Sequence, residues 1–199
     1  SATLDADAQR IATLLDDAPV VTAQGLSHPV ELRYLDREPG TPADETARAV
    51  RRALAGQSQD VLAFLPGAGE IRKTQRLLQA HLPADCIVRP LYGDLPFADQ
   101  VAALRPDPTR RRVVLATDIA ETSLTIEGIS TVVDCGLARE PRFDPNTGLT
   151  RLVTRRVSSA SATQRAGRAG RLGPGTSYRL WTEDQQQRLE PRRQPEILS

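Results

Sequence analysis

The sequence predicts an α/β fold, with a parallel sheet covered by helices on both faces and a projecting β-hairpin. Uninterrupted apolar runs at residues 61–65 and 113–116 have the length and composition of strands that are buried on both faces. Stretches of helical periodicity separate such runs, and this β-α-β-α-β order is typical of a parallel sheet. The sequence Asn-Thr-Gly at residues 146–148, flanked by apolar residues, favours a hairpin turn.

The N-terminal quarter predicts two helices and two strands. Residues 5–17 carry apolar groups at helical spacing, and residues 20–22 and 30–35 have the composition of strands, the second with alternating character. Thr41 followed by Pro42 predicts the start of a helix, because threonine caps helices and proline suits their first position. We expect that helix to end at Gly56.

The rest of the chain alternates strands with helices. Strands are predicted at residues 61–65, 87–92, 113–116, 131–134 and 176–181, and helices at 71–82, at 97–104 and after Glu183. A projecting hairpin is expected over residues 140–157. Since ligands of parallel sheets bind at the carboxyl ends of strands, the polar segments 66–70, 93–95, 117–125 and 136 onward are the candidate site.

Composition limits the function further. The 26 basic and 25 acidic residues nearly cancel, and no apolar run is long enough to span a membrane, so we expect no membrane partner. Cys86 and Cys135 are isolated within apolar runs, which indicates buried, reduced thiols and suits a cytoplasmic protein. His28 and His81 have no ligand-spaced partners, so no metal site is predicted.

The most distinctive stretch is residues 164–171, in which arginines recur at every third position with only Ala and Gly between them. On a helical turn, Arg165, Arg168 and Arg171 would project as a row. No Asp or Glu occurs from residue 145 to residue 182, so the positive charge is concentrated. A solvated basic loop is the ordinary alternative. The spacing and the small intervening residues favour phosphate recognition by the planar guanidinium groups.

A second phosphate motif is excluded. Residues 67–74 follow a strand and match a P-loop at Gly67, Lys73 and Thr74, but Arg72 occupies the position of the second glycine. That glycine lets backbone amides turn toward the phosphate, and arginine fits poorly there. A stand-alone GTPase or kinase is therefore not supported, and a partner surface must supply the grip on the nucleotide.

These segments together resemble the DEAH/RHA branch of superfamily-two ATP-dependent RNA helicases. Residues 164–171 resemble helicase motif VI, and residues 116–129, Ala-Thr-Asp-Ile-Ala-Glu-Thr-Ser-Leu-Thr-Ile-Glu-Gly-Ile, resemble motif V. Residues 64–71, 90–95 and 1–3 resemble motifs IV, IVa and III, in the family's order. Within the branch, residues 64–71 look most like the bacterial HrpB-type helicases.

The resemblance implies a fragment of a longer enzyme. Residues 1–22 would be the tail of the first RecA-like domain, residues 23–182 the second RecA-like, or helicase C-terminal, domain, and residues 183–199 a linker or the start of a helical domain. ATP or another NTP with Mg²⁺ would be held mainly by the first RecA-like domain of the same chain, where the family has its P-loop and DExH motif. The implied activity is NTP-driven 3′-to-5′ translocation on single-stranded RNA, with DNA as the other substrate, and the fragment alone would be inactive.

The resemblance also implies roles at the nucleotide. Gln164 matches the glutamine that positions the attacking water, and Arg168 and Arg171 match arginines that stabilise charge on the γ-phosphoryl group. Ser123 matches a γ-phosphate sensor and Glu127 a ribose-binding carboxylate. Arg165 matches a cofactor-contacting position, and a salt bridge or a surface contact is the equal alternative.

The nucleic-acid residues implied by the resemblance are Gly67, Gly93, Thr117, Asp118, Thr122 and Arg142. Turn hydrogen bonding is the alternative for Thr122. The family usually has Asn at the position of Asp118, and eukaryotic relatives an adenine-stacking aromatic near that of Leu104. Arg139 and Arg151 join Arg142 in the hairpin, which resembles an element near the duplex junction. The other function considered is a degenerate RecA-like module that binds nucleic acid without a catalytic role.

Overall fold

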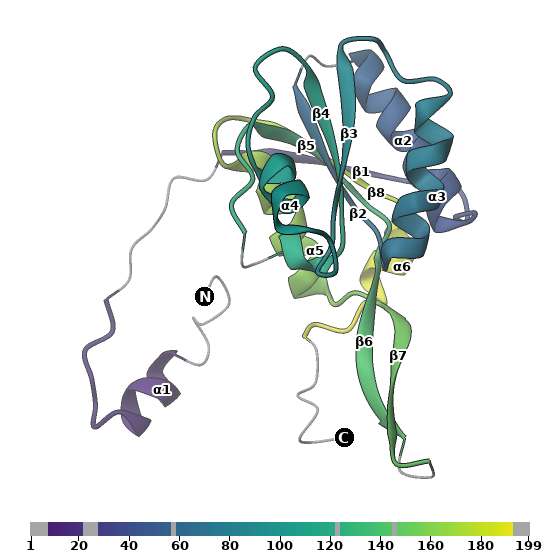
Figure 1. Cartoon of the computed structure of the whole chain (residues 1–199). Helices are drawn as coiled ribbons and strands as arrows, with labels where there is room; N and C mark the ends of the chain where they lie inside the picture. Colours follow the sequence, from purple (N-terminus) through teal and green to yellow (C-terminus); the bar gives the residue numbers. More distant parts are fainter. Residues whose placement is uncertain (1–7, 22–27, 57–58, 122–123, 145–146, 193–199) are drawn as a thin grey trace.

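A computed structural model describes residues 8–21, 28–56, 59–121, 124–144 and 147–192. Its centre is a sheet of parallel strands in the order β1-β8-β5-β2-β4-β3 (Figure 1). The strands are β1 (Val30–Tyr34), β2 (Asp60–Phe64), β3 (Cys86–Leu91), β4 (Arg111–Ala116), β5 (Ile129–Asp134) and β8 (Gly175–Arg179). The predicted α/β class is confirmed.

Helices cover both faces of this sheet. One face carries α2 (Pro42–Gly56) and α3 (Ala68–Gln79), and we call it the α2–α3 face (Figure 1). The other carries α4 (Phe97–Leu104), the 3₁₀ turn η1 (Asp118–Ala120), α5 (Ser159–Gly167) and the 3₁₀ turn η2 (Arg168–Gly170), and we call it the α4–α5 face. Each face has its own apolar cluster. The layering follows from the unbroken apolar strands, which must be covered on both sides.

Strand alternation assigns neighbouring side chains to opposite faces. Val61 and Ala63 join the cluster under α2 and α3, whereas Leu62 and Phe64 join the cluster of the α4–α5 face. Two consecutive arginines of β4 continue this pattern. Arg111 donates a hydrogen bond to the carbonyl of Leu54 in α2, and Arg112 donates to carbonyls on the opposite face.

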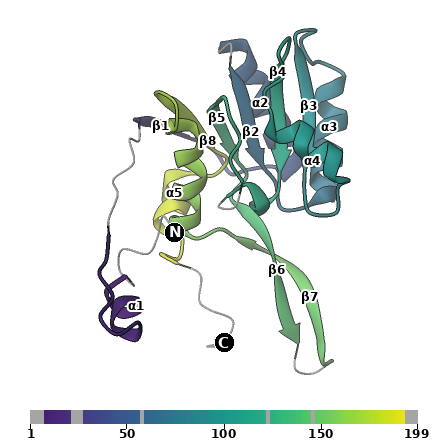
Figure 2. The same cartoon turned by 60° about the vertical axis from the view of Figure 1, so that its left-hand side comes forward.

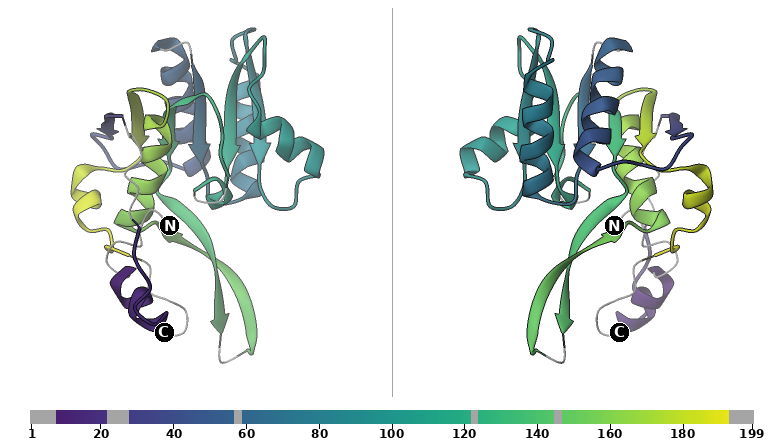
Figure 3. Two further views of the ribbon diagram at one scale, coloured as in Figure 1. Left: turned by 90° about the vertical axis from the view of Figure 1, so that its left-hand side faces the viewer. Right: turned by 90° about the vertical axis from the view of Figure 1, so that its right-hand side faces the viewer.

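The hairpin consists of β6 (Leu137–Asp144) and β7 (Leu149–Arg156), paired antiparallel. It leaves the sheet beyond the carboxyl end of β5 and projects away from the helices (Figures 2 and 3). The chain turns into it at Gly136, whose φ is +74°, and a Cβ there would lie 2.7 Å from the Trp181 ring. Gly148 has a φ of +66° in the hairpin turn. The predicted projecting hairpin is confirmed.

Several predicted boundaries differ from the structure. Helix α1 is Ala8–Leu14 and lies away from the sheet (Figure 1), and α3 ends at Gln79, before Leu82. The strand predicted at residues 20–22 is wrong for Val20 and Val21, which lie in no strand; residue 22 lies outside the described residues. Val21 is 90% exposed, and none of the strands in the described residues pairs with it.

The edge strand β1 and the helix after Glu183 agree with their predictions to different degrees. β1 is an edge strand whose three central residues are all exposed, so its predicted alternation does not appear in the burial pattern. The predicted helix after Glu183 is α6 (Glu183–Gln187), and a capping box between Thr182 and Gln185 fixes its start.

Candidate nucleotide and nucleic-acid site

The three arginines of residues 164–171 do not form a row. Helix α5 ends at Gly167 and continues as the tighter turn η2, which changes the angular step between side chains. Arg165 is 1% exposed and Arg168 5% exposed, whereas Arg171 is exposed. The row predicted for a continuous helix is therefore wrong, and the three side chains have three different environments.

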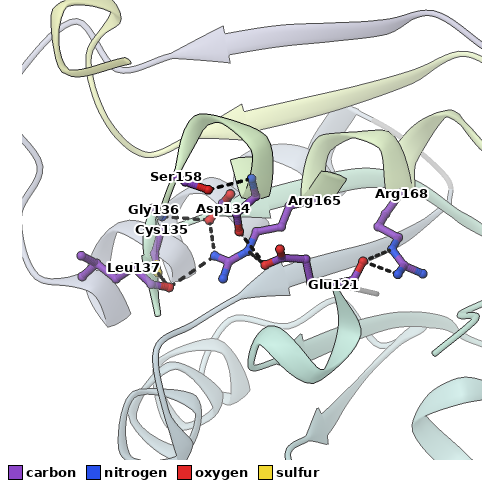
Figure 4. Close-up of polar contacts among 9 residues, drawn as sticks. Glu121, Asp134, Cys135, Gly136, Leu137, Ser158, Arg165 and Arg168 are labelled. Carbon is purple, nitrogen blue, oxygen red and sulfur yellow. Dashed lines mark hydrogen bonds and ion pairs between the residues drawn. The ribbon is translucent and has the colours of Figure 1, made fainter. Parts of the chain in front are cut away.

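Arg165 is held within the domain by two carboxylates (Figure 4). Its Nε donates to Glu121 Oε2 and its Nη1 to Asp134 Oδ1, each at 2.9 Å. The guanidinium also lies over the Phe64 ring, 4.8 Å from its centroid. Burial works to lower the pKa of Arg165, but Asp134 and Glu121 outweigh it and hold the pKa above its usual value. This geometry matches the salt-bridge alternative for Arg165.

Glu121 connects this ion pair to a second helix position. Its Oε2 also accepts a hydrogen bond from Ser161 Oγ at 2.6 Å, and its side chain is 12% exposed. Ser161 lies in the first turn of α5, where the Ser158 hydroxyl caps the helix by accepting from the Ser161 amide. Glu121 is thus fastened to α5 at two points.

Arg168 is also buried, but among the described residues it forms no ion pair with a carboxylate. Its Nε and Nη2 both donate to the main-chain carbonyl of Glu121 (Figure 4). Its Nη1 donates to the carbonyl of Leu124 at 2.6 Å. Burial lowers the pKa of Arg168 to about 10, with the nearby Arg171 acting in the same direction and the Glu121 carboxylate against it, so the group is charged at neutral pH. Carbonyl dipoles solvate this charge but do not neutralise it.

Arg171 and Gln164 are the members of the segment that face outward. Arg171 is exposed and has no hydrogen bond or ion pair with another residue in the described ranges. Gln164 is half-buried on α5, and Thr163 beside it is exposed. The exposed Arg171 guanidinium, with the charged and buried Arg168 nearby, makes this part of the surface positive, which suits a phosphate group.

Three residues expected at nucleic acid follow neighbouring strands of the sheet. Gly67 follows β2, Thr117 follows β4 and Gly93 follows β3, and these strands are adjacent in the order β2-β4-β3. The topology therefore brings them to one carboxyl edge. Gly93 is exposed, and Thr117 is half-buried where it begins η1. Gly67 is buried because the Arg139 guanidinium covers it.

The remaining predicted residues are dispersed. Asp118 is half-buried in η1, and Arg142 is exposed on the hairpin, opposite Arg151 in the β6–β7 register. Thr122 and Ser123 lie outside the described residues. Leu104, the position expected to carry an adenine-stacking group in eukaryotic relatives, packs against the apolar cluster of the α4–α5 face.

Glu127 lies near the amino end of β5, with an exposed side chain. Its main-chain carbonyl accepts a hydrogen bond from Arg112, which is 0% exposed. Arg112 Nε donates to Asp60 Oδ2 at 2.7 Å, and its Nη1 donates to the carbonyls of Ala103 and Arg105. Arg112 therefore ties together β4, the end of α4 and the turn that presents Glu127.

Sequence analysis did not identify Glu121, Asp134 or Arg112 as residues of this site. One signal was present: charged residues directly at the ends of buried apolar runs must find partners, because an unpaired buried charge is costly.

Within the described part of the chain, no group of three or more His, Cys, Asp or Glu residues could hold a metal ion. None of the helices described there has the length and apolar character needed to cross a membrane.

The model of the helicase conserved C-terminal domain matches residues 45–173. The chain belongs to this family. Over the whole chain it is 52% identical to the ATP-dependent RNA helicase HrpB of Escherichia coli (strain K12), of which it covers 24%. Over 99% of the chain it is 39% identical to the human ATP-dependent RNA helicase DHX33, of which it covers 29%. The chain thus spans about a quarter of the length of these curated relatives.

Other comparisons agree with this assignment. The chain is 40% identical to the pre-mRNA-splicing factor ATP-dependent RNA helicase prp22 of Schizosaccharomyces pombe, over 92% of its own length and 16% of that protein's. A crystal structure of the Escherichia coli DEAH/RHA helicase HrpB superimposes with a TM-score of 0.89 at 51% identity, covering 99% of this chain and 25% of that one. The RecA-like fold and the resemblance to DEAH/RHA helicases are confirmed.

Proposed function

We propose that this helicase C-terminal domain is the second RecA-like domain of a DEAH-type, ATP-dependent RNA helicase. It supplies arginines to the hydrolysed nucleotide and part of the track for NTP-driven 3′-to-5′ translocation and unwinding. The observation that carries the proposal is the contrast within residues 164–171. Two carboxylates pair with Arg165, whereas the hydrogen bonds of Arg168 within the described residues go to main-chain carbonyls, and Arg171 is exposed. Such un-neutralised cations favour a polyanion.

The residues fit a nucleotide that another surface grips. ATP with Mg²⁺, held mainly by the first RecA-like domain of the same chain, supplies the phosphoanhydride bond that is hydrolysed. On this chain, Arg168 and Arg171 stabilise negative charge on the transferring group, and Gln164 orients the attacking water. The exposed carboxylate of Glu127 accepts hydrogen bonds from ribose hydroxyls. Arg165 acts as a positioning residue beneath this surface.

The carboxyl edge of the sheet forms the nucleic-acid track. Gly93 and Thr117 offer an amide and a small hydroxyl that contact the backbone of single-stranded RNA without reading its sequence. Arg142 on the hairpin adds a charge at the point where the duplex opens.

The domain limits in this proposal are residues 1–22 for the first-domain tail and 183–199 for the following linker. Two buried, unpaired cysteines support a cytoplasmic location.

The test is RNA-stimulated ATP hydrolysis by the full-length protein that contains this chain. Arg168→Ala is expected to lower kcat by about 10³-fold, the lower end of the effect of arginine fingers. Arg110→Ala is the matched control, because Arg110 is an exposed arginine paired with Asp107 away from residues 164–171. Unchanged hydrolysis in Arg168→Ala would contradict the proposal and support the degenerate binding module instead. Turnover by residues 1–199 alone would also contradict it.

A further inference from the structure

Glu121 contacts the arginine segment, by which we mean residues 164–171, through both its side chain and its main chain. The carboxylate accepts from Arg165 and Ser161, and the carbonyl accepts from Arg168 (Figure 4). We propose that Glu121 is a positioning residue that couples the nucleic-acid edge of the sheet to Arg168. This inference rests on the proposed function, since it assigns Glu121 a part in that reaction.

The side-chain contacts fix where Glu121 lies relative to α5. Arg165 is 1% exposed, so its ion pair with Glu121 is shielded from water and from salt. Ser161 Oγ donates to the same Oε2 atom from one helical turn earlier in α5. A carboxylate held by two donors from one helix has little freedom to rotate, and its main chain is therefore fixed as well.

The main-chain contacts then fix Arg168. Both Nε and Nη2 of Arg168 donate to the Glu121 carbonyl, and Nη1 reaches the carbonyl of Leu124. The direction of the guanidinium is set by two carbonyls that lie three residues apart. A displacement of Glu121 therefore reorients Arg168, although the two residues are distant in the sequence.

The same residue is joined to the nucleic-acid edge. Glu121 directly follows η1, and its amide donates to the carbonyl of Asp118 at 2.8 Å. η1 begins after Thr117, whose amide donates to the Leu91 carbonyl at the end of β3. A nucleic-acid strand that contacts Thr117 therefore contacts the start of a short, hydrogen-bonded segment, and this segment ends at Glu121. The path from nucleic acid to Arg168 runs through this one residue.

Glu45 provides a comparison residue without such a path. Its side chain is 5% exposed, so the carboxylate is buried like that of Glu121, but it accepts from Arg37 and Arg48, whose side chains are exposed. It lies in α2, on the opposite face of the sheet. A glutamine at either position keeps the shape and one acceptor oxygen but removes the charge.

The experiment measures ATP hydrolysis by the full-length protein with and without single-stranded poly(A) RNA. Glu121→Gln is expected to lower the RNA-stimulated kcat about tenfold or more and the RNA-free rate by a smaller factor, with the KM for ATP changed less than about threefold. The ratio of stimulated to unstimulated rate therefore falls. Glu45→Gln is expected to keep the wild-type ratio, although it too removes the charge of a buried carboxylate that is paired with arginine.

A wild-type stimulation ratio in Glu121→Gln, or an equal loss in Glu45→Gln, overturns the inference. If Glu121→Gln does not fold, Ser161→Ala decides, because it removes one donor and leaves the ion pair; a ratio lowered about two- to fivefold is expected and an unchanged one overturns the inference. The proposed function fails separately, if the wild type shows no RNA-stimulated hydrolysis or Arg168→Ala leaves it unchanged.

Discussion

The two faces of the sheet are built on different principles. The α2–α3 face is covered by two long amphipathic helices over apolar side chains, and its arginines pair at the surface. The α4–α5 face is covered by shorter helices and 3₁₀ turns. All four buried arginines of the described part of the chain lie on this second face: Arg112, Arg165, Arg168 and Arg179.

This difference shows that apolar packing stabilises the α2–α3 face, whereas directed polar contacts contribute more to the α4–α5 face. Apolar packing is non-directional and is lost only when the helix leaves the sheet. A buried guanidinium instead donates in fixed directions to particular carbonyls and carboxylates. The α4–α5 face is accordingly the one suited to respond to bound phosphate, and the α2–α3 face the one suited to support it.

The largest expected effect compares two consecutive residues that point to opposite faces. Arg112→Met leaves the Asp60 carboxylate and carbonyls on the α4–α5 face without their buried donor, so the free energy of unfolding is expected to fall by about 3–5 kcal/mol. Arg111→Met breaks a pair with the largely exposed Asp85 and a hydrogen bond to the Leu54 carbonyl, and it is expected to cost about 1–2 kcal/mol. Urea denaturation measures both, and equal losses would contradict the comparison.

A cavity on the other face separates stability from activity. Leu78 in α3 is 0% exposed, so Leu78→Ala is expected to lower the free energy of unfolding by about 3 kcal/mol. RNA-stimulated kcat of the folded, full-length protein is expected to stay within about twofold of wild type, because α3 packs on the α2–α3 face and the arginines of residues 164–171 lie on the opposite face. Loss of kcat without loss of folded protein would show that the α2–α3 face is not merely supporting.

A smaller effect concerns acid. Burial acts to raise the pKa of Glu45, but the Arg37 hydrogen bond, the Gly40 amide and Arg48 hold it below the usual value. A carboxylate with a lowered folded pKa stabilises the protein above its unfolded pKa, and this contribution is lost as pH falls through the folded pKa. Glu45→Gln is thus expected to cost about 2 kcal/mol at pH 7 and progressively less below about pH 4.5. Urea denaturation of wild type and Glu45→Gln at pH 7 and below about pH 4.5 measures this. A difference in the free energy of unfolding that does not change with pH would contradict the prediction.

The smallest effect is kinetic. Burial raises the pKa of the Cys135 thiol to about 12 and that of Cys86 above its usual value, and both lie in the apolar cluster of the α2–α3 face. Native protein at pH 8 is expected to react with iodoacetamide only through opening of that face, as mass spectrometry would show. Leu78→Ala should accelerate labelling, and Ser161→Ala, on the opposite face, should not. Fast labelling of the native wild type would contradict this account.

Sequence analysis predicted the elements that depend on local chemistry. Proline after Thr41 sets the start of α2, and α4 has the predicted bounds of residues 97 and 104. The failures occur where a partner was needed. Val20 and Val21 have the composition of a strand but no strand beside them, and Leu82 continues the apolar spacing of α3 after its hydrogen bonding has ended.

By itself, the sequence determined the α/β class, the hairpin and the helicase motifs, because periodicity, turn residues and motif spacing are local properties of the chain. Only the tertiary structure decided how the arginines divide. Their strict spacing in the sequence predicts one equivalent row, yet Arg165 has Glu121 and Asp134, Arg168 has carbonyls, and Arg171 faces outward. The partners come from residues 31–47 positions away in the chain. Charge neutralisation depends on such distant neighbours, so spacing alone could not assign the separate roles.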